Sequence, residues 1–434
     1  MKKLLAILLL GLAASLGMQA QDRAHILKVY NWADYLDMKL IQEFEQWYKA
    51  QTGEEVKIVY ETFDINENML MQIEKGHEDY DVVCPSDYII ERMLRNDLLQ
   101  PIQKNFGKTP NYLNNVSPFA IDKFQQMAPR KGITVSDYTV GYMWGTTGFL
   151  YNAKYVKPEE ITSWGALLNP KFKNNIYVKD AFRDVYTSLI CYAKYDLIKS
   201  GKTTHEELST NITDENISAV EKVLKDAKPQ IAGWEVDFGK ERMTQGKAWI
   251  DLTWSGDAMW AIEEAKETGV KLVYTVPQEG SNVWFDGWVI PKYAKNAKAA
   301  SYFINFMCMP ENAIRNMDET GYVSVISTPE VIEEMTDSTL NKTVDASYFF
   351  VGIPGADSLM LNEVFYPDKS VIDRCVLMHD CQDKTEKMLA MWDNVKGNNL
   401  NTTMIIFIAA AVLIIIGAII YTRIRKNRKH HRRR

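Results

Sequence analysis

The chain has 434 residues, of which 46% are hydrophobic and 24% are charged, with 23 Gly and 14 Pro. This balance is typical of globular proteins and excludes a collagen-like or mostly disordered chain. The length allows roughly two to three domains, each large enough to bury a core without disulfide bonds.

The net charge of −6 is unevenly distributed along the chain. Lys2, Lys3 and the basic residues after position 421 lie in the two terminal segments, whereas all 56 acidic residues lie between those segments. The middle of the chain is therefore acidic. An acidic domain favours a cationic ligand and disfavours nucleic acid as a partner.

The two terminal segments predict where the chain is located. Residues 1–20 combine a basic start, a short apolar run and small residues, which is typical of a secretory signal peptide. After a linker over 397–403, the uncharged run 404–421 is long enough for a transmembrane helix. The basic tail 422–434 predicts a cytoplasmic end. The body is then expected in the periplasm, tethered to the inner membrane by this helix.

In chain order, the body alternates between strands and helices. A strand is predicted over 25–30 and a second over 56–60, with a helix between them that ends at Gly53. Such alternation indicates a largely parallel sheet, with ligands bound at the carboxyl ends of its strands. The further predicted elements are helices capped by Asn66, Ser86 and Asn296, strands over 80–84, 175–178, 248–252 and 284–290, and a helix over 217–224.

The chain contains none of the common catalytic signatures. No P-loop, G-x-G-x-x-G, H-E-x-x-H or G-x-S-x-G motif is present, and six histidines leave little material for a metal site. We therefore expect no enzyme, no catalytic residue, no metal and no cofactor. A hydrolase alternative would depend on His379 and Cys381, the only residues of suitable type.

The five cysteines are an odd number for an exported chain, so at least one must be free. Cys84 and Cys308 lie in apolar runs and are expected in the core. Cys375 and Cys381 can pair with each other.

Aromatic residues stand next to carboxylates at three places. These are Trp32 with Asp34 and Tyr35, Trp254 with Asp257, and Trp284 with Asp286. A dicationic alkylamine needs such a set, because each desolvated ammonium requires a carboxylate and the methylenes gain from flat aromatic walls. The alternative is that these aromatic side chains are simply core.

Several motifs together resemble one family, the periplasmic spermidine/putrescine-binding proteins of ABC importers. They occur in the family's order at 30–35 (Tyr-Asn-Trp-Ala-Asp-Tyr), 80–86, 142–148, 254–257 (Trp-Ser-Gly-Asp), 284–286 (Trp-Phe-Asp) and 321–322. The resemblance covers about residues 26 to 395 and implies the two-lobed α/β fold of type II periplasmic binding proteins, here with one C-terminal transmembrane helix added. The implied first lobe is 26–139 with 285–335, and the second is 140–284 with 336–396.

The resemblance also implies a ligand site. Asp34 would bind one terminal ammonium, Asp286 a central or second one, and Asp184 and Asp257 other amine positions. Trp32, Tyr35, Trp254, Trp284 and Tyr322 would wall the methylenes, and Ser86 and Tyr88 would add hydroxyl contacts. Asp180 is a weaker candidate than these residues, because the pattern around it is shifted by one residue relative to the family. Ala33, Asp257 and Met378 leave the choice between putrescine and spermidine open.

The resemblance implies a monomeric receptor that binds a polyamine and delivers it to the membrane subunits of an ABC permease. Two alternatives are a membrane-tethered polyamine sensor or adaptor and a binding protein for another cationic solute. The basic tail is too short for a signalling domain, so transport is favoured.

Overall fold

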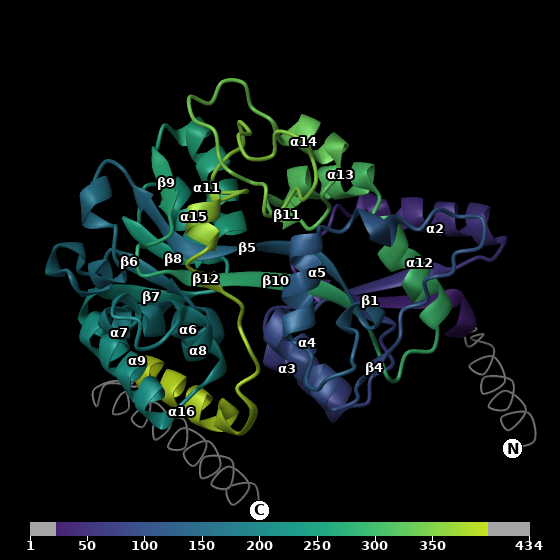
Figure 1. Cartoon of the computed structure of the whole chain (residues 1–434), viewed down its shortest axis with the longest axis horizontal. Helices are drawn as coiled ribbons and strands as arrows, with labels where there is room; N and C mark the ends of the chain where they lie inside the picture. Colours follow the sequence, from purple (N-terminus) through teal and green to yellow (C-terminus); the bar gives the residue numbers. More distant parts are fainter. Residues whose placement is uncertain (1–22, 398–434) are drawn as a thin grey trace, which may run out of the picture.

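One set of paired strands organises the protein. The computed structural model describes residues 23–397, and the strands of this part form a twelve-stranded arrangement with the main order β2-β1-β3-β10-β5-β8-β6-β7. β5 (Thr139–Asn152) and β10 (Ser281–Pro291) lie at its centre, pair antiparallel and run from one lobe into the other (Figure 1). Both are buried along their whole length. The expected two-lobed α/β fold is confirmed.

The first lobe is built on parallel strands next to β10. β1 (Ile26–Trp32) pairs with β2 (Lys57–Phe63) and β3 (Val82–Val83), and β3 pairs antiparallel with β10. The other elements of this lobe are α2 (Lys39–Thr52), α3 (Asn66–Glu74), α4 (Asp87–Arg95), β4 (Leu99–Gln100), α5 (Pro118–Gln126), α12 (Ala297–Met307), α13 (Pro310–Thr320), β11 (Val323–Ser324) and α14 (Pro329–Met335).

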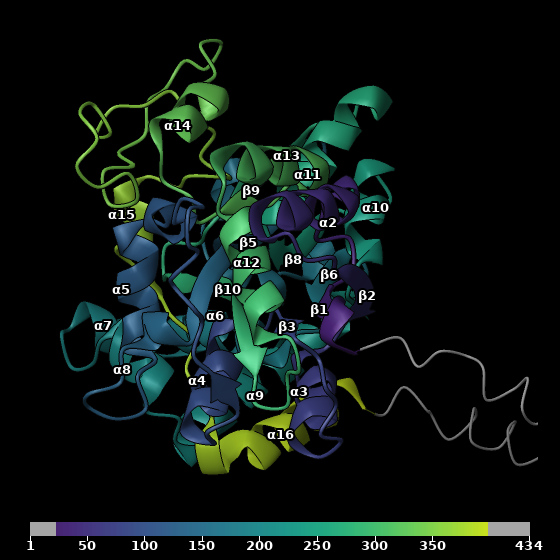
Figure 2. The same ribbon diagram turned by 90° about the vertical axis from the view of Figure 1, so that its right-hand side faces the viewer.

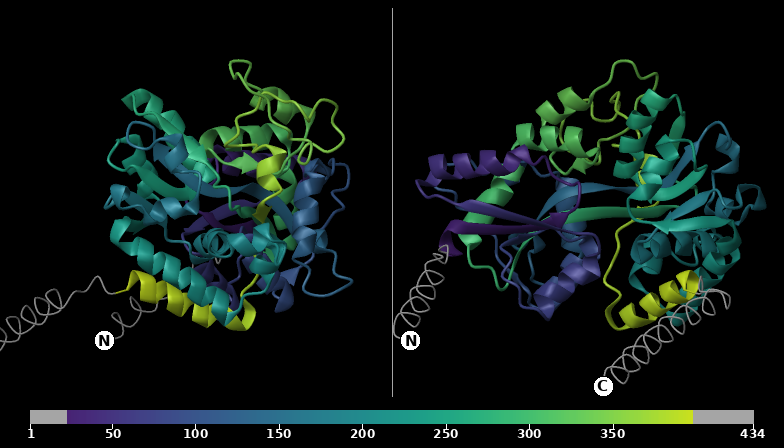
Figure 3. Two further views of the ribbon diagram at one scale, coloured as in Figure 1. Left: turned by 60° about the vertical axis from the view of Figure 1, so that its left-hand side comes forward. Right: turned by 180° about the vertical axis from the view of Figure 1, so that it is seen from behind.

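The second lobe repeats this arrangement on the other side of β5. β8 (Ile250–Trp254) pairs antiparallel with β5 and parallel with β6 (Ile176–Lys179), which pairs with β7 (Ile231–Glu235). Helix α16 (Thr385–Lys396) shares a core with α9 (Asp214–Ala227) and lies along it (Figure 3). The other elements here are α6 (Phe182–Ala193), α7 (Tyr195–Lys199), α8 (His205–Thr210), α10 (Phe238–Thr244), α11 (Ser255–Thr268) and β9 (Leu272–Thr275).

Between α14 and α15 (Lys369–Ile372) the chain forms loops at one edge of the molecule (Figure 2). Phe349 stacks on Trp144 of β5 with ring centroids 5.0 Å apart, and β12 (Cys375–Val376) then pairs with β10. Buried residues from 344 to 378 therefore belong to the first core, although the sequence expectation assigned 336–396 to the second lobe. The remaining lobe boundaries stay a prediction.

The expected fold class needs one correction, which concerns the membrane. No helix within residues 23–397 is long and apolar enough to cross one, so the described chain is a two-lobed α/β protein without an added transmembrane helix. The segments 1–20 and 404–421, where the signal peptide and the membrane helix were expected, lie outside the described residues.

The five cysteines are all free and buried. Cys375 and Cys381 do not pair, because Cys375 belongs to the first core and Cys381 to the second. Cys84 and Cys308 lie in the first core, as expected.

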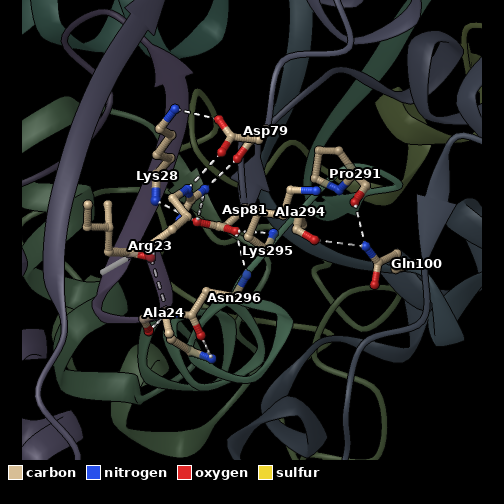
Figure 4. A network of polar contacts seen from close by, with 12 residues as sticks. Arg23, Ala24, Lys28, Asp79, Asp81, Gln100, Pro291, Ala294, Lys295 and Asn296 are labelled. Carbon is tan, nitrogen blue, oxygen red and sulfur yellow. Dashed lines mark hydrogen bonds and ion pairs between the residues drawn. The ribbon is translucent and has the colours of Figure 1, made fainter. Parts of the chain in front are cut away.

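The start of the described chain is fixed by two carboxylates, one of them fully buried (Figure 4). Arg23 forms ion pairs of 2.8 Å with both Asp79 and Asp81, and the backbone nitrogens of Lys295 and Asn296 donate to Asp81 at 2.8 Å. These contacts join the residues before β1 and β3 to the beginning of α12, and so hold the edge of the first lobe together.

Candidate functional site

A cavity of about 390 Å³ lies between the lobes and is lined by side chains from both. Every residue expected at the site contributes to its wall. These residues are Trp32, Asp34, Tyr35, Ser86, Tyr88, Asp180, Asp184, Trp254, Asp257, Trp284, Asp286 and Tyr322. The structure thus brings the whole predicted set together, while the role of each residue in binding stays a prediction.

Asp286 lies on β10 beside a register shift to Gly287, at the point where the strand passes Ser86. Its carboxylate accepts hydrogen bonds from Ser86 Oγ at 2.6 Å and from Tyr35 OH at 2.8 Å. No ion-pair partner for it occurs among residues 23–397. Burial raises the pKa of Asp286 to about 7, and the charge of Asp184 adds to this, although the two hydrogen bonds oppose it.

Asp184 is the second buried carboxylate of the cavity without an ion pair in the described chain. It lies in the first turn of α6, and its Oδ1 accepts hydrogen bonds from Trp254 Nε1 at 3.0 Å and Asn282 Nδ2 at 2.9 Å. Burial raises the pKa of Asp184 despite these bonds. A cation placed between Asp184 and Asp286 would therefore relieve two desolvated charges at once.

Aromatic rings from both lobes form one wall of the cavity. Tyr322 contacts Tyr35 edge-on at 4.8 Å and Trp284 at 5.8 Å between ring centroids. Gly256 permits this arrangement, because a Cβ at that position would lie 2.3 Å from the Tyr322 ring. Flat rings of this kind suit alkyl chains and attract cations.

Asp257 is already paired within the protein. Its carboxylate lies 2.6 Å from Lys179 Nζ and 3.4 Å from Lys240 Nζ, and it accepts a hydrogen bond from Tyr322 OH at 2.8 Å. Burial tends to raise its pKa, but the two lysine charges outweigh burial and lower it. The expected role of Asp257 as a ligand carboxylate therefore conflicts with the presence of Lys179.

Asp180 is occupied in a similar way at the edge of the cavity. It accepts a hydrogen bond from Trp392 Nε1 at 2.9 Å and forms an ion pair with Lys396, both on α16. Asp34, in contrast, is exposed and adopts a positive φ of 51° in the turn after β1. Tyr88 donates to Glu67 at 2.9 Å.

The cavity as a whole is acidic. Its wall contains nine carboxylates and four cationic side chains. In the described residues no group of three or more His, Cys, Asp or Glu is arranged to hold a metal ion. An acidic, aromatic cavity without such a group suits an organic cation.

Comparison with known proteins identifies the family. The model of the family described as bacterial extracellular solute-binding protein matches residues 39–343. The chain belongs to this family. As a solute-binding protein it is a receptor rather than an enzyme.

Individual solute-binding proteins are similar over most of their length. The spermidine/putrescine-binding periplasmic protein of Salmonella typhimurium is 31% identical over 74% of this chain and 84% of its own. The putrescine-binding periplasmic protein PotF of Escherichia coli is 29% identical over 78% and 88%. The structure of the spermidine/putrescine ABC transporter substrate-binding protein PotD from Streptococcus pneumoniae has a TM-score of 0.61 at 28% identity, covering 86% of this chain and 98% of that one.

Sequence reasoning missed the residues that surround the expected carboxylates in this solute-binding protein. Lys179 and Glu235 line the cavity beside Asp257, and Asn282 donates to Asp184. Lys179 ends β6 and Glu235 ends β7, so their place at the carboxyl ends of strands was the available signal. Their pairing with Asp257 had no signal in the sequence.

Proposed function

We propose that this protein is the receptor of an ABC importer for linear polyamines. Two ammonium groups of the ligand bind Asp286 and Asp184, and the methylenes lie against Trp284, Trp254 and Tyr322. The single observation that carries the proposal is the presence of two buried carboxylates without ion pairs in one aromatic cavity. A solute with two positive charges and an apolar linker matches this arrangement.

Other lining residues complete the proposed site. Asp34 also lines the cavity but is exposed, so its carboxylate stays solvated and adds negative charge to the cavity rather than a third amine position. Trp32 and Tyr35 extend the aromatic wall, while Ser86 and Tyr88 orient Asp286 and Glu67 through their hydroxyls. Asp257 and Asp180 do not bind an amine of the ligand directly. They form ion pairs with lysines of the cavity wall and so fix the positions of those lysines.

The similar proteins support the ligand class and the partner. The Salmonella relative is named for spermidine and putrescine, the Escherichia coli relative for putrescine, and the Streptococcus structure for an ABC transporter. We therefore propose that this protein works in the periplasm and passes its ligand to the membrane subunits of an ABC permease.

Calorimetric titration of the purified protein with putrescine, spermidine, spermine and arginine tests the proposal. We expect micromolar or tighter binding of at least one polyamine. Arginine is expected to give no heat, because its carboxylate would meet the acidic wall of the cavity. Absence of both heat and thermal stabilisation with every polyamine would contradict the proposal and leave another cationic solute as the ligand.

A further inference from the structure

Lys179 has the surroundings that a bound primary amine requires. Its side chain is completely buried at the end of β6, and its Nζ lies 2.6 Å from Asp257 Oδ2 and 2.9 Å from Glu235 Oε1. It also donates to the backbone oxygen of Val236. Two carboxylates and one carbonyl oxygen thus surround the ammonium group, which has three donors.

An aromatic face completes this environment. Lys179 Nζ lies 4.5 Å from the centroid of a Trp254 ring, within the range of a cation–π interaction. Trp254 also donates its indole N–H to Asp184, one of the two carboxylates without an ion pair. The Trp254 ring therefore lies between the ammonium of Lys179 and the carboxylate of Asp184. The lysine ammonium therefore lies beside the proposed ligand path rather than in an unrelated part of the core.

The two cavity-lining carboxylates beside Lys179 already have a cationic partner. Asp257 is shared between Lys179 and Lys240, and Glu235 pairs with Lys179 through Oε1 while its Oε2 accepts from the backbone nitrogen of Gly239 at 2.9 Å. This differs from Asp286 and Asp184, which have hydrogen-bond donors but no ion-pair partner in residues 23–397. Among the buried carboxylates that line the cavity in residues 23–397, Asp286 and Asp184 are thus the two that remain for an ammonium group.

We infer that Lys179 is a built-in cation that fills an end position of the cleft and limits the ligand to a linear diamine. The inference rests on the proposed function. A third ammonium extending past Trp254 would meet the ammonium of Lys179 in a poorly solvated site, where like charges repel strongly. A diamine of putrescine or cadaverine length places its two charges on Asp286 and Asp184 and stops before this point.

Competitive titration of the full chain with putrescine, cadaverine, spermidine and spermine tests the inference. We expect the wild type to bind a diamine at least about tenfold more tightly than spermidine. Lys179→Met keeps an unbranched side chain but removes the cation between Asp257 and Glu235. It is expected to shift the spermidine-to-putrescine affinity ratio at least about tenfold towards spermidine.

Lys194→Met is the matched control, because Lys194 is also an ion-paired lysine of the second lobe, 2.5 Å from Glu215, but does not line the cavity. Its affinity ratio should equal that of the wild type. An unchanged ratio in a folded Lys179→Met would overturn the inference. If that variant does not fold, the affinities of the wild type provide the test. A wild type that binds spermidine as tightly as putrescine would also overturn the inference. Failure to bind any polyamine would instead overturn the proposed function as well.

Discussion

Asp286 and Asp257 are both buried carboxylates of the same cavity, yet their surroundings give them opposite properties. Two lysines hold Asp257 ionised, whereas Asp286 has only hydroxyl donors and its pKa is raised to about 7. An ion-paired carboxylate is a fixed part of the wall. An unpaired one destabilises the empty protein and gains a partner when a cation binds.

The first prediction concerns binding by Asp286. Asp286→Asn keeps the shape of the side chain but removes the charge that would face a desolvated ammonium, so we expect a loss of roughly 2 to 5 kcal/mol in polyamine affinity. Titration calorimetry measures the loss. Asp357→Asn, at an exposed position outside the cavity, is the control. An affinity within twofold of the wild type would remove Asp286 from the site.

The second prediction concerns the stability of the empty protein. The pKa of Asp286 is raised in the folded state from 3.8 to about 7, so the folded state binds the proton more tightly than the unfolded state. Its contribution to stability is therefore complete below about pH 4 and is lost as the pH rises to about 7. Urea unfolding without ligand should show this loss between pH 4 and pH 7 in the wild type and a smaller one in Asp286→Asn. Equal pH dependence in both proteins would contradict the assignment.

At the level of helices and strands, the local patterns predicted the elements well but failed for two caps. Helix α12 begins as expected, with the Asn296 side chain accepting from the backbone nitrogen of Ala299. Ser86 precedes α4 as expected, but its hydroxyl donates to Asp286 instead of capping the helix. Asn66 is the first residue of α3 rather than its cap, and its amide donates to Ser86. Both polar side chains are used by the site.

The third prediction concerns the start of α11. Gly256→Ala would place a Cβ 2.3 Å from the ring of Tyr322, so either the ring or the helix must move. We expect a loss of about 1 to 3 kcal/mol in stability. Polyamine affinity should fall roughly tenfold as the aromatic wall opens. Denaturant unfolding and titration measure the two effects.

Gly233→Ala in β7 is the control for this variant, since its nearest neighbour is one edge of the Tyr177 ring at 3.2 Å. Gly233→Ala should leave polyamine affinity unchanged. If Gly256→Ala binds polyamine with the affinity of the wild type, the role of Tyr322 in binding does not depend on its close contact with Gly256.

At the level of the whole molecule, the lobes are connected within residues 23–397 by β5, by β10 and, as a third segment, by the chain that leads from β12 to α16 (Figure 1). His379 lies in the third segment and contacts both lobes. Its Nδ1 is 3.0 Å from Glu91 on α4, and its Nε2 is 3.3 Å from Glu206 on α8. The histidine proposed as part of a hydrolase alternative is thus engaged in joining the lobes.

The fourth prediction follows from this contact. Burial disfavours the charged form of His379, but Glu206 and Glu91 outweigh burial and raise its pKa from 6.5 to about 9. Because the folded pKa lies above the unfolded one, the stabilisation is complete below pH 6.5 and disappears as the pH rises to about 9. We expect a loss of about 2 to 3 kcal/mol over this interval.

Chemical unfolding of the wild type and of His379→Gln from pH 6 to pH 10 measures the effect. The variant should lack most of this pH dependence. His77→Gln is the control, because His77 is exposed and contacts the Tyr293 ring in a tilted arrangement, with ring centroids 4.6 Å apart. A His379→Gln curve parallel to that of the wild type would show that the carboxylates do not hold a charged imidazole.

The sequence by itself determined the alternation of strands and helices and the residue types of the site, and its resemblance to a known family implied the two-lobed fold. The alternation follows from hydrophobic periodicity, and the place of the site follows from motifs at the ends of strands, where neighbouring parallel strands bring their loops together. The tertiary structure alone decided which charges are paired. Lys179 and Asp257 are 78 residues apart, and Asp180 meets Lys396 from 216 residues away.

The same reason explains the other differences. Residues 344–378 pack on the first lobe and Cys375 stays apart from Cys381, because the chain returns to β5 and β10 before it crosses to α16. Local sequence patterns carry no information on contacts between such distant segments. Those contacts determine which carboxylates form ion pairs within the protein and which do not. In the proposed function they thereby set the number of amines that the cleft binds.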